Sequence, residues 1–322
     1  MSSDRLSEHI PVMLESVVGL LGCRPGGLYV DGTLGGGSYA EAILQRIGPR
    51  GRLIGLDWDA EAIARVSVRL ADHGERVVLR KASFGDLAPL LSEMELGGVD
   101  GIVLDLGVSS PQLEDGTRGF SFMEDGPLDM RMDRSRPDTA ADLVNGLSER
   151  ELTQLIRTLG EERWAKRIAR AIVSRRKVRV FYRTKELADL VAGVVPRTPD
   201  SRRIHPATRT FQALRIAVNE ELEALRSFLG SVLDVLNPGG RLCIVAFHSL
   251  EDRMVKEHFR RWASACRCPV EEPFCRCEGK PLVRLLTKKA LRPTDEEVEI
   301  NPRARSARLR AMEKYGEAED QR

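Results

Sequence analysis

The chain has 322 residues, of which 42% are hydrophobic and 30% are charged, a balance that is typical of globular proteins and excludes a disordered or fibrous chain. Its 50 Lys and Arg residues and 48 Asp and Glu residues leave a net charge of +2, so overall charge does not indicate a nucleic-acid partner. No segment approaches the ~20 apolar residues of a membrane helix, and the polar N-terminus does not resemble a signal peptide. We therefore expect a cytoplasmic protein that binds neither membranes nor DNA.

The first third of the sequence alternates between short apolar runs and amphipathic stretches. Strands are predicted over residues 28–31, 52–57, 77–79 and 99–105, and helices over residues 40–47 and 60–70. Asp59 is placed to cap the second helix. Three of the strands end in an acid: Asp31, Asp57 and Asp105. This alternation predicts an α/β fold with a parallel, doubly wound sheet that binds its ligand at the carboxyl ends of the strands.

The alternation stops after about residue 110. Residues 111–137 are rich in Gly, Pro, Asp and Arg without a clear period, and a loop of this length is usually functional. Helical segments follow, with Thr184 expected to cap the helix over residues 185–194. A single long helix is predicted from Pro206 to Leu236, ended by the Asn-Pro-Gly-Gly sequence that follows. The apolar strand over residues 242–247 then resumes the sheet, and residues 306–312 are predicted to form a final edge strand.

A glycine-rich sequence from Asp31 to Tyr39 follows the first strand. Its Gly35-x-Gly37-x-x-Ala40 pattern fits the dinucleotide fingerprint with alanine last, although a tight turn alone also needs glycine. Asp57 lies about 20 residues further on, where a carboxylate can accept hydrogen bonds from ribose hydroxyls. Together these features favour an adenosine-type ligand.

The acids at the strand ends distinguish between adenosine ligands. A dinucleotide carries an anionic pyrophosphate, whereas S-adenosylmethionine (SAM) carries a sulfonium and an ammonium cation that carboxylates attract. Phe84, just past the third strand, can pack on adenine or belong to the core. The alternative is an NAD-dependent oxidoreductase, which would use the same glycine turn and Asp57.

A second motif extends from Leu104 to Gln112, with Asp105 at the strand end and Ser110-Pro111 after it. It resembles the Asp-Pro-Pro-Tyr loop of enzymes that methylate exocyclic amines of bases. The lone pair of such an amine is delocalised into the ring, so acceptors must hold the N–H groups while the lone pair faces the methyl donor. The acceptor can be Asp105, the Ser110 hydroxyl or a backbone carbonyl near Pro111, and Gln112 stands where the related loops have a second proline. Asp105 and Ser110 are the candidate catalytic residues, and Asp105 can equally hold SAM.

These motifs resemble those of the bacterial ribosomal RNA small subunit methyltransferase H (MraW) family, which methylates N4 of a cytosine in the decoding region of 16S rRNA. The matching segments are residues 9–14, 29–35, 100–113, 118–122, 125–133, 160–162, 205–215, 247–253 and 301–306. The resemblance implies a class I SAM-dependent methyltransferase. Its Rossmann-like domain would comprise residues 1–113 and 216–322, and an inserted helical substrate-recognition domain would comprise residues 114–215.

The resemblance also implies a set of cofactor contacts. By position, the family's SAM-binding residues correspond to Gly37, Ser38, Tyr39, Asp57, Phe84, Asp105 and Gln112. One residue departs from the family pattern, because Ser38 adds a Cβ where relatives usually have glycine. A further alternative is a non-catalytic ribosome-assembly factor on the same scaffold, although the intact glycines and acids argue against a decayed site.

Basic residues cluster from Arg163 to Lys185, where the sequence has ten Lys and Arg residues and no acid. A solvated helix face is the ordinary explanation, but within the insertion of an RNA enzyme phosphate contact is favoured. Further candidates for contact with 16S rRNA are Arg118, Arg131, Arg209 and His248, and the alternative for the arginines is ion pairs with nearby acids. A base in folded RNA would be splayed out to reach the pocket.

Four of the six cysteines lie close together as Cys266-x-Cys268 and Cys275-x-Cys277. Four thiolates can bind zinc, but the spacing within each pair is one residue rather than the usual two or more, so we expect free thiols and no metal. The sequence does not distinguish a monomer from a dimer, or naked rRNA from the assembled subunit as substrate.

Overall fold

A computed structural model of the chain describes residues 11–196, 205–266, 268, 272, 274 and 279–316. The chain divides into two compact units. The first, the sheet unit, comprises Met1–Gly107 and Glu223–Arg322, and the second, the helical unit, comprises Val108–Leu222. The helical insertion therefore extends over residues 108–222 rather than the expected 114–215.

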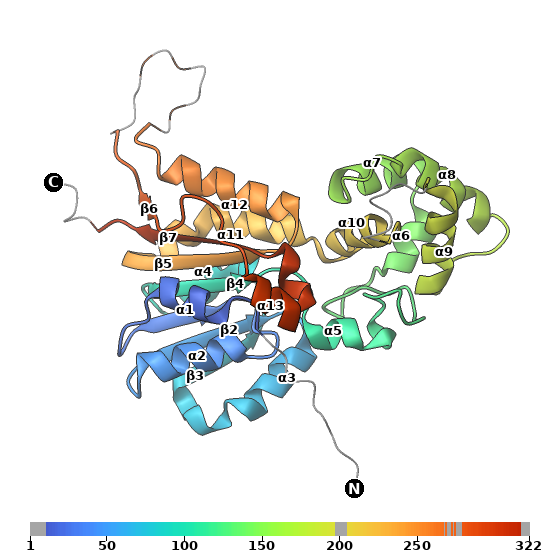
Figure 1. Ribbon diagram of the computed structural model, residues 1–322. Helices are drawn as coiled ribbons and strands as arrows, with labels where there is room; N and C mark the ends of the chain where they lie inside the picture. The colour runs from blue at the N-terminus through green and yellow to red at the C-terminus, as the bar shows by residue number, and fades with distance from the viewer. Residues whose placement is uncertain are drawn as a thin grey trace, which may run out of the picture. The chain divides into compact units, whose positions relative to one another are not determined.

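The sheet unit contains a seven-stranded sheet in the order β3-β2-β1-β4-β5-β7-β6 (Figure 1). The strands are β1 (Leu28–Asp31), β2 (Arg52–Asp57), β3 (Val77–Lys81), β4 (Val99–Asp105), β5 (Leu236–Ala246), β6 (Val283–Leu285) and β7 (Arg308–Lys314). Strands β1 to β5 are parallel, and β7 runs antiparallel to both of its neighbours. The predicted doubly wound α/β fold is confirmed. The predicted edge position of the last strand is wrong, because β7 lies between β5 and β6.

Helices cover both faces of this sheet (Figure 1). One face packs against α1 (Leu14–Leu21), α2 (Ser38–Ile47) and α3 (Ala60–Arg69), and the other against α4 (Leu87–Glu93), α11 (Glu221–Val235) and α12 (Ser249–Trp262). Successive strand residues enter opposite cores, as Val103 and Leu104 do in β4. Burial on both faces explains why these strands read as continuous apolar runs.

The helical unit has a core of its own. Its helices are α5 (Ser110–Glu114), α6 (Ala140–Gly146), α7 (Glu149–Leu159), α8 (Ala165–Arg176), α9 (Thr184–Val194) and α10 (Thr208–Asn219). Apolar side chains spaced three or four residues apart, such as Leu152 and Ile156 in α7 and Ile168 and Ile172 in α8, are fully buried in this core.

Two helix predictions are wrong in detail. The expected single helix from Pro206 to Leu236 is two helices, α10 and α11, separated by Glu220 in the left-handed conformation with φ 53°. The apolar stripe continues across this break, so periodicity does not reveal it. Thr184 is the first residue of α9 rather than its cap, and its Oγ1 accepts a hydrogen bond from the Gly126 N–H (3.1 Å).

Buried polar contacts order part of the irregular segment over residues 111–137. Asn219 Nδ2 donates to the carbonyls of Met130 (2.8 Å) and Arg215 (2.9 Å), and its Oδ1 accepts from the Met132 N–H (2.7 Å). Arg118 is 3% exposed and donates to the carbonyls of Arg131 and Met132 (3.1 and 2.9 Å). The side chain of Arg118 is thus used inside the helical unit, and its contact with RNA stays a prediction.

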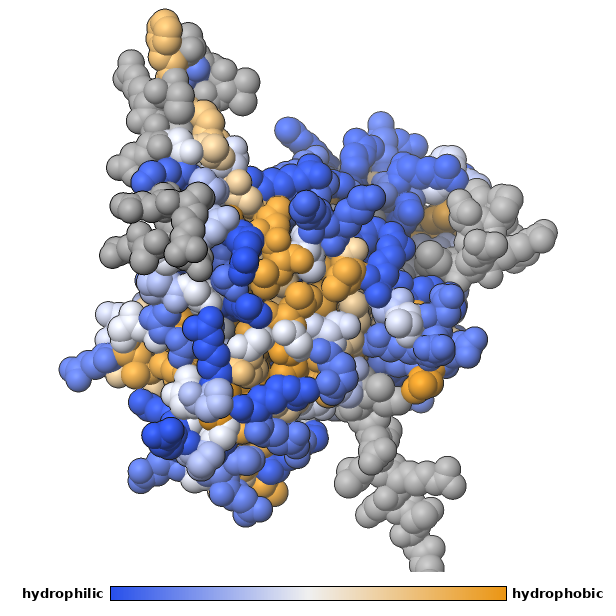
Figure 2. Space-filling model, turned by 60° about the vertical axis from the view of Figure 1, so that its left-hand side comes forward, coloured by the Kyte–Doolittle hydropathy of each residue, from blue (hydrophilic) through white to orange (hydrophobic). Residues whose placement is uncertain are grey.

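In the part of the chain that the structure describes, no helix is long and apolar enough to cross a membrane. Hydrophilic residues predominate on the face drawn in Figure 2, with smaller hydrophobic areas between them.

Replacing Asn219 by alanine should destabilise the protein by about 2–3 kcal/mol, because the buried Met130 carbonyl and the Met132 N–H lose their partner and the Arg215 carbonyl loses one hydrogen bond. Urea unfolding measures the change. Gln154→Ala, an exposed substitution in α7, is the matched control and should alter the free energy of unfolding by no more than about 0.5 kcal/mol. Equal effects of the two substitutions would contradict this account of the segment.

Candidate active site

Three carboxylates lie at the carboxyl ends of β1, β2 and β4, and we call them the acid edge: Asp31, Asp57 and Asp105. Asp57 accepts hydrogen bonds from the N–H groups of Gly35 and Asp59, both at 2.8 Å. Among the described residues, Asp31 Oδ2 and Asp105 Oδ1 are buried without a hydrogen-bond partner. Because a buried acceptor without a partner is unfavourable, these two atoms indicate a place where a ligand supplies the missing charge or donor.

Burial disfavours the ionised form of these three acids. It raises the pKa of Asp31 to about 7 and that of Asp57 to about 6, and it raises the pKa of Asp105 well above its usual range. Neighbouring negative charge adds to the effect, from Asp57 on Asp31 and from Asp31 and Glu251 on Asp105. A cation at the acid edge would relieve both the desolvation and the repulsion.

The glycine loop between β1 and α2 turns through left-handed backbone. Gly35 and Gly37 have φ values of 50° and 82°, which favour glycine. A Cβ at Gly37 would also lie 2.9 Å from Val66 Cγ1. Ser38, whose side chain departs from the family pattern, is the first residue of α2 and is partly exposed. The loop therefore brings backbone close to the acid edge, since the Gly35 N–H bonds to Asp57.

Two aromatic rings lie beyond the ends of β2 and β3. Phe84 and Trp58 are nearly parallel, with ring centroids 6.3 Å apart and an interplanar angle of 20°. Trp58 therefore lies beside Phe84, the residue predicted to contact the ligand, and the sequence analysis did not identify Trp58. The available signal was the position of Trp58, directly after the acid that ends β2. The Tyr39 side chain, by contrast, is buried and its hydroxyl donates to the carbonyl of Val12.

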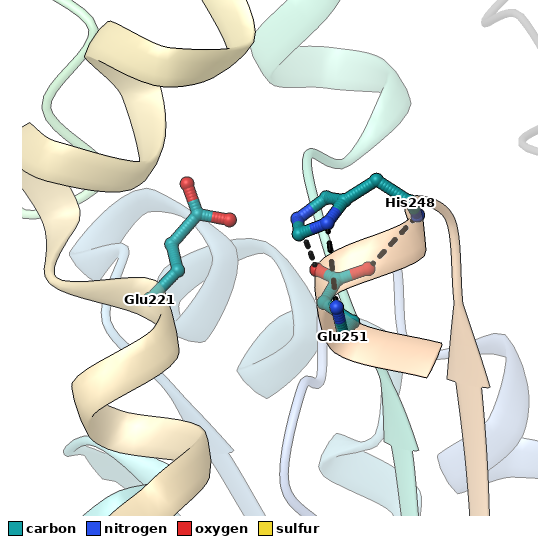
Figure 3. A group of neighbouring side chains, drawn as sticks. All are labelled: Glu221, His248 and Glu251. Atoms are coloured by element: carbon teal, nitrogen blue, oxygen red, sulfur yellow. Dashed lines mark hydrogen bonds and ion pairs between the residues drawn. The ribbon is translucent and has the colours of Figure 1, made fainter. Parts of the chain in front are cut away.

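His248 and Glu251 form a buried pair at the start of α12 (Figure 3). His248 Nδ1 accepts from the Glu251 N–H (3.4 Å), and Nε2 lies 3.1 Å from Glu251 Oε1. The other carboxylate oxygen accepts from the N–H groups of Phe247 (2.9 Å) and His248 (3.2 Å). The two side chains are only 8% and 3% exposed, and together they cap the start of α12. Glu251 is also a charged neighbour of Asp105, which the sequence analysis did not identify.

The remaining predicted site residues lie in the helical unit. Ser110 begins α5, and the buried Gln112 accepts from the Ser109 N–H (3.1 Å), so their predicted roles stay predictions. Arg131 forms an ion pair with Asp129 (2.7 Å), as the structural alternative expects. Arg209 is exposed, with one hydrogen bond to the carbonyl of Glu161 (3.3 Å).

Ion pairs neutralise part of the basic segment from Arg163 to Lys185. Arg175 and Arg179 pair with Glu186, and Arg183 pairs with Asp125. Lys166 and Arg167 in α8 and Lys177 after it are exposed. These exposed cations are the part of the segment best placed to contact a polyanion.

The zinc hypothesis depends on four cysteines, of which the structure describes two. Cys266 is exposed and Cys268 is partly exposed, whereas Cys275 and Cys277 lie outside the described residues. The expectation of free thiols therefore stays a prediction. The motif segment over residues 9–14 is likewise described only from residue 11.

Comparison with known proteins identifies the family. The family model described as the MraW methylase family matches residues 6–315. The chain belongs to this family. It is 64% identical over 309 residues to the ribosomal RNA small subunit methyltransferase H of Syntrophobacter fumaroxidans, covering 96% of this chain and 97% of the relative. Proteins of the same name from Trichlorobacter lovleyi and Symbiobacterium thermophilum are 53% and 49% identical, over 96% and 97% of this chain and 98% of each relative.

Membership of the MraW methylase family confirms the predicted class of enzyme. The chain is a SAM-dependent methyltransferase of class I fold, and the alternative of an NAD-dependent oxidoreductase is wrong. The acid edge fits this donor, because SAM carries two cationic groups and two buried carboxylate oxygens lack a partner in the described residues.

The affinity for SAM should rise with pH between 5.5 and 8. Asp31 and Asp57, with pKa values of about 7 and 6, are mostly protonated at the lower pH. Once ionised, Asp31 attracts a cation and Asp57 becomes a stronger hydrogen-bond acceptor. We expect the dissociation constant to fall about tenfold over this range, with protons released on binding. Calorimetry in buffers of different ionisation enthalpy measures both quantities. Asp31→Asn should flatten the profile, and a flat wild-type profile would contradict the assignment.

Proposed function

We propose that this enzyme transfers the methyl group of SAM to N4 of a cytosine in the decoding region of 16S rRNA, and that it acts in the cytoplasm on the small ribosomal subunit. The acid edge carries this proposal, because it offers a cation-binding carboxylate and a proton acceptor at one place. The names of relatives at 49–64% identity, which refer to small subunit rRNA, support the RNA substrate.

Residues of the sheet unit hold the donor in this proposal. The backbone of Gly37 and Ser38 lies along it, Asp57 accepts hydrogen bonds from its ribose, and Phe84 with Trp58 flanks its adenine. Asp31 and Asp105 balance its positive charge. When bound, SAM supplies an electrophilic methyl group on a sulfonium that departs as a neutral thioether.

Asp105 also suits the role of proton acceptor. Its Oδ1 has no hydrogen-bond partner among the described residues, and the positive charge of bound SAM favours the ionised carboxylate that can accept a proton. In the proposed reaction it accepts an N–H hydrogen bond from the cytosine amine, directs the lone pair toward the methyl group and takes the proton that the amine loses. Ser110 is the alternative acceptor.

The helical unit supplies the RNA contacts in this proposal. Arg209 and the exposed cations of α8, Lys166 and Arg167, can bind phosphates without breaking ion pairs that the structure shows. Arg131 and His248 already have partners within their own units, so direct contact with RNA would require them to exchange those partners.

Asp105→Asn should lower the rate of methyl transfer at saturating SAM by about a hundredfold or more, because the amide cannot take the proton. Tritium transfer from labelled SAM to under-methylated small subunits and to naked 16S rRNA measures the rate, and mass spectrometry of the RNA locates the mark. Asp234→Asn, an exposed substitution in α11, is the control. A mark that the wild-type enzyme places on another atom would contradict the proposal, and RNA binding by the wild-type enzyme without any transfer would favour an assembly factor.

Replacing both Lys166 and Arg167 by alanine should weaken RNA binding and reduce the slope of log affinity against log salt by about 1.4–1.8, since each phosphate contact contributes about 0.7–0.9. Filter binding over a range of salt concentrations measures the slope. Arg226→Ala, which removes an exposed cation of α11 in the sheet unit, should leave it unchanged. A salt-independent wild-type affinity would rule out phosphate contact.

A further inference from the structure

Tyr39 makes a contact that links two distant parts of the sheet unit. It is the second residue of α2, directly after the glycine loop, and its side chain is 4% exposed. Its hydroxyl donates to the carbonyl of Val12, which precedes α1. The glycine loop is therefore tied to the residues that lead into α1.

Glu297 holds the same residues from the other end of the sequence. Its Oε1 accepts a hydrogen bond from the Met13 N–H, and it lies in α13 (Asp295–Ile300). Met13 is the N-cap of α1 and has left-handed backbone with φ 52°. A residue other than glycine stays in this conformation only where its surroundings hold it, and a carboxylate at a helix N-terminus is also favourable.

Apolar packing reinforces these two hydrogen bonds. Val12 and Met13 are 6% and 4% exposed, and they belong to the same core cluster as Leu34 of the glycine loop and Ala304, which follows α13. The two hydrogen bonds and this shared packing thus hold together residues 12–13, the glycine loop and the segment around α13.

This structure lies beside the acid edge. The pKa of the Tyr39 hydroxyl is raised well above its usual value, first by burial and then by the negative charges of Asp105, Asp31 and Glu297. The hydroxyl is therefore neutral at physiological pH and remains a donor to Val12. The same neighbours show that the contact lies close to the proposed methyl-donor site rather than at the opposite edge of the sheet.

We propose that Tyr39 and Glu297 are positioning residues for SAM binding. Tyr39 fixes the end of the glycine loop against residues 12–13, and Glu297 fixes those residues, so that the loop keeps its binding conformation before the donor arrives. A loop that is ordered in advance loses less conformational freedom on binding. The inference rests on the proposed SAM contacts, and it gives the Tyr39 side chain a supporting role in place of direct contact with SAM.

Tyr39→Phe is the first test, because it removes only the hydroxyl. The dissociation constant for SAM, measured by calorimetry, should rise about five- to tenfold, which is the effect expected of leaving a buried carbonyl unpaired. Tyr29→Phe is the matched control. Tyr29 is equally buried, and its hydroxyl accepts from the Arg24 N–H (2.8 Å) at the start of β1, away from the acid edge. It should change SAM affinity less than twofold.

Glu297→Ala and the double variant Tyr39→Phe/Glu297→Ala form the second test. If both residues act through residues 12–13, Glu297→Ala also weakens SAM binding, and the double variant is at most about twofold weaker than the weaker single variant. The KM for SAM should rise in each, while kcat at saturating SAM stays within twofold. Because Glu297 is partly exposed, its variant keeps the test decisive if Tyr39→Phe does not fold.

Three results would overturn the inference: equal effects of Tyr39→Phe and Tyr29→Phe on SAM affinity, full additivity in the double variant, or a loss of kcat at saturating SAM. Its failure is distinguishable from failure of the proposed function. Calorimetry with SAM tests the positioning role whichever atom of the RNA is methylated, whereas a mark away from cytosine N4 contradicts the proposed function alone.

Discussion

The enclosure of carboxylates at one edge of a parallel sheet is the constraint on which the rest of the site depends. An acid whose pKa rises on folding destabilises the folded chain as pH increases from its unfolded to its folded pKa, for Asp31 from about 4 to about 7. The protein therefore carries an electrostatic cost at neutral pH when no ligand is bound. A bound cation offsets that cost, so part of the affinity for the donor comes from relieving the desolvation and mutual repulsion of these carboxylates.

The division into two units separates the strands that carry the acid edge from the insertion. The helical unit buries its own apolar residues, so the sheet unit keeps both of its cores intact although more than a hundred residues separate β4 from β5. Pairing of β5 with β4 places Val245 beside Asp105 and fixes the last strand end of the acid edge. Substrate-binding surface can therefore vary in the insertion without disturbing the strands that hold the acids.

Local patterns sufficed for the parts of the fold that depend on neighbouring residues. Apolar runs ending in an acid located β1, β2 and β4, and Asp59 caps α3 as predicted. Features set by distant pairing were missed or misplaced. A short amphipathic run does not reveal that β7 lies inside the sheet, and a motif does not reveal that Arg118 is buried. The ties of Tyr39 to Val12 and of Glu297 to Met13 join residues 27 and 284 positions apart.

The late position of β7 in the sequence has a consequence for biosynthesis. Because translation proceeds from the N-terminus, β1 to β4 leave the ribosome well before β5, and β4 has an unpaired edge until residue 246 has emerged. Strand β5 in turn pairs with β7 only after a further sixty or so residues have been made, because β7 begins at Arg308. An open strand edge favours association with other chains, so the nascent protein is most exposed to aggregation before β7 is made.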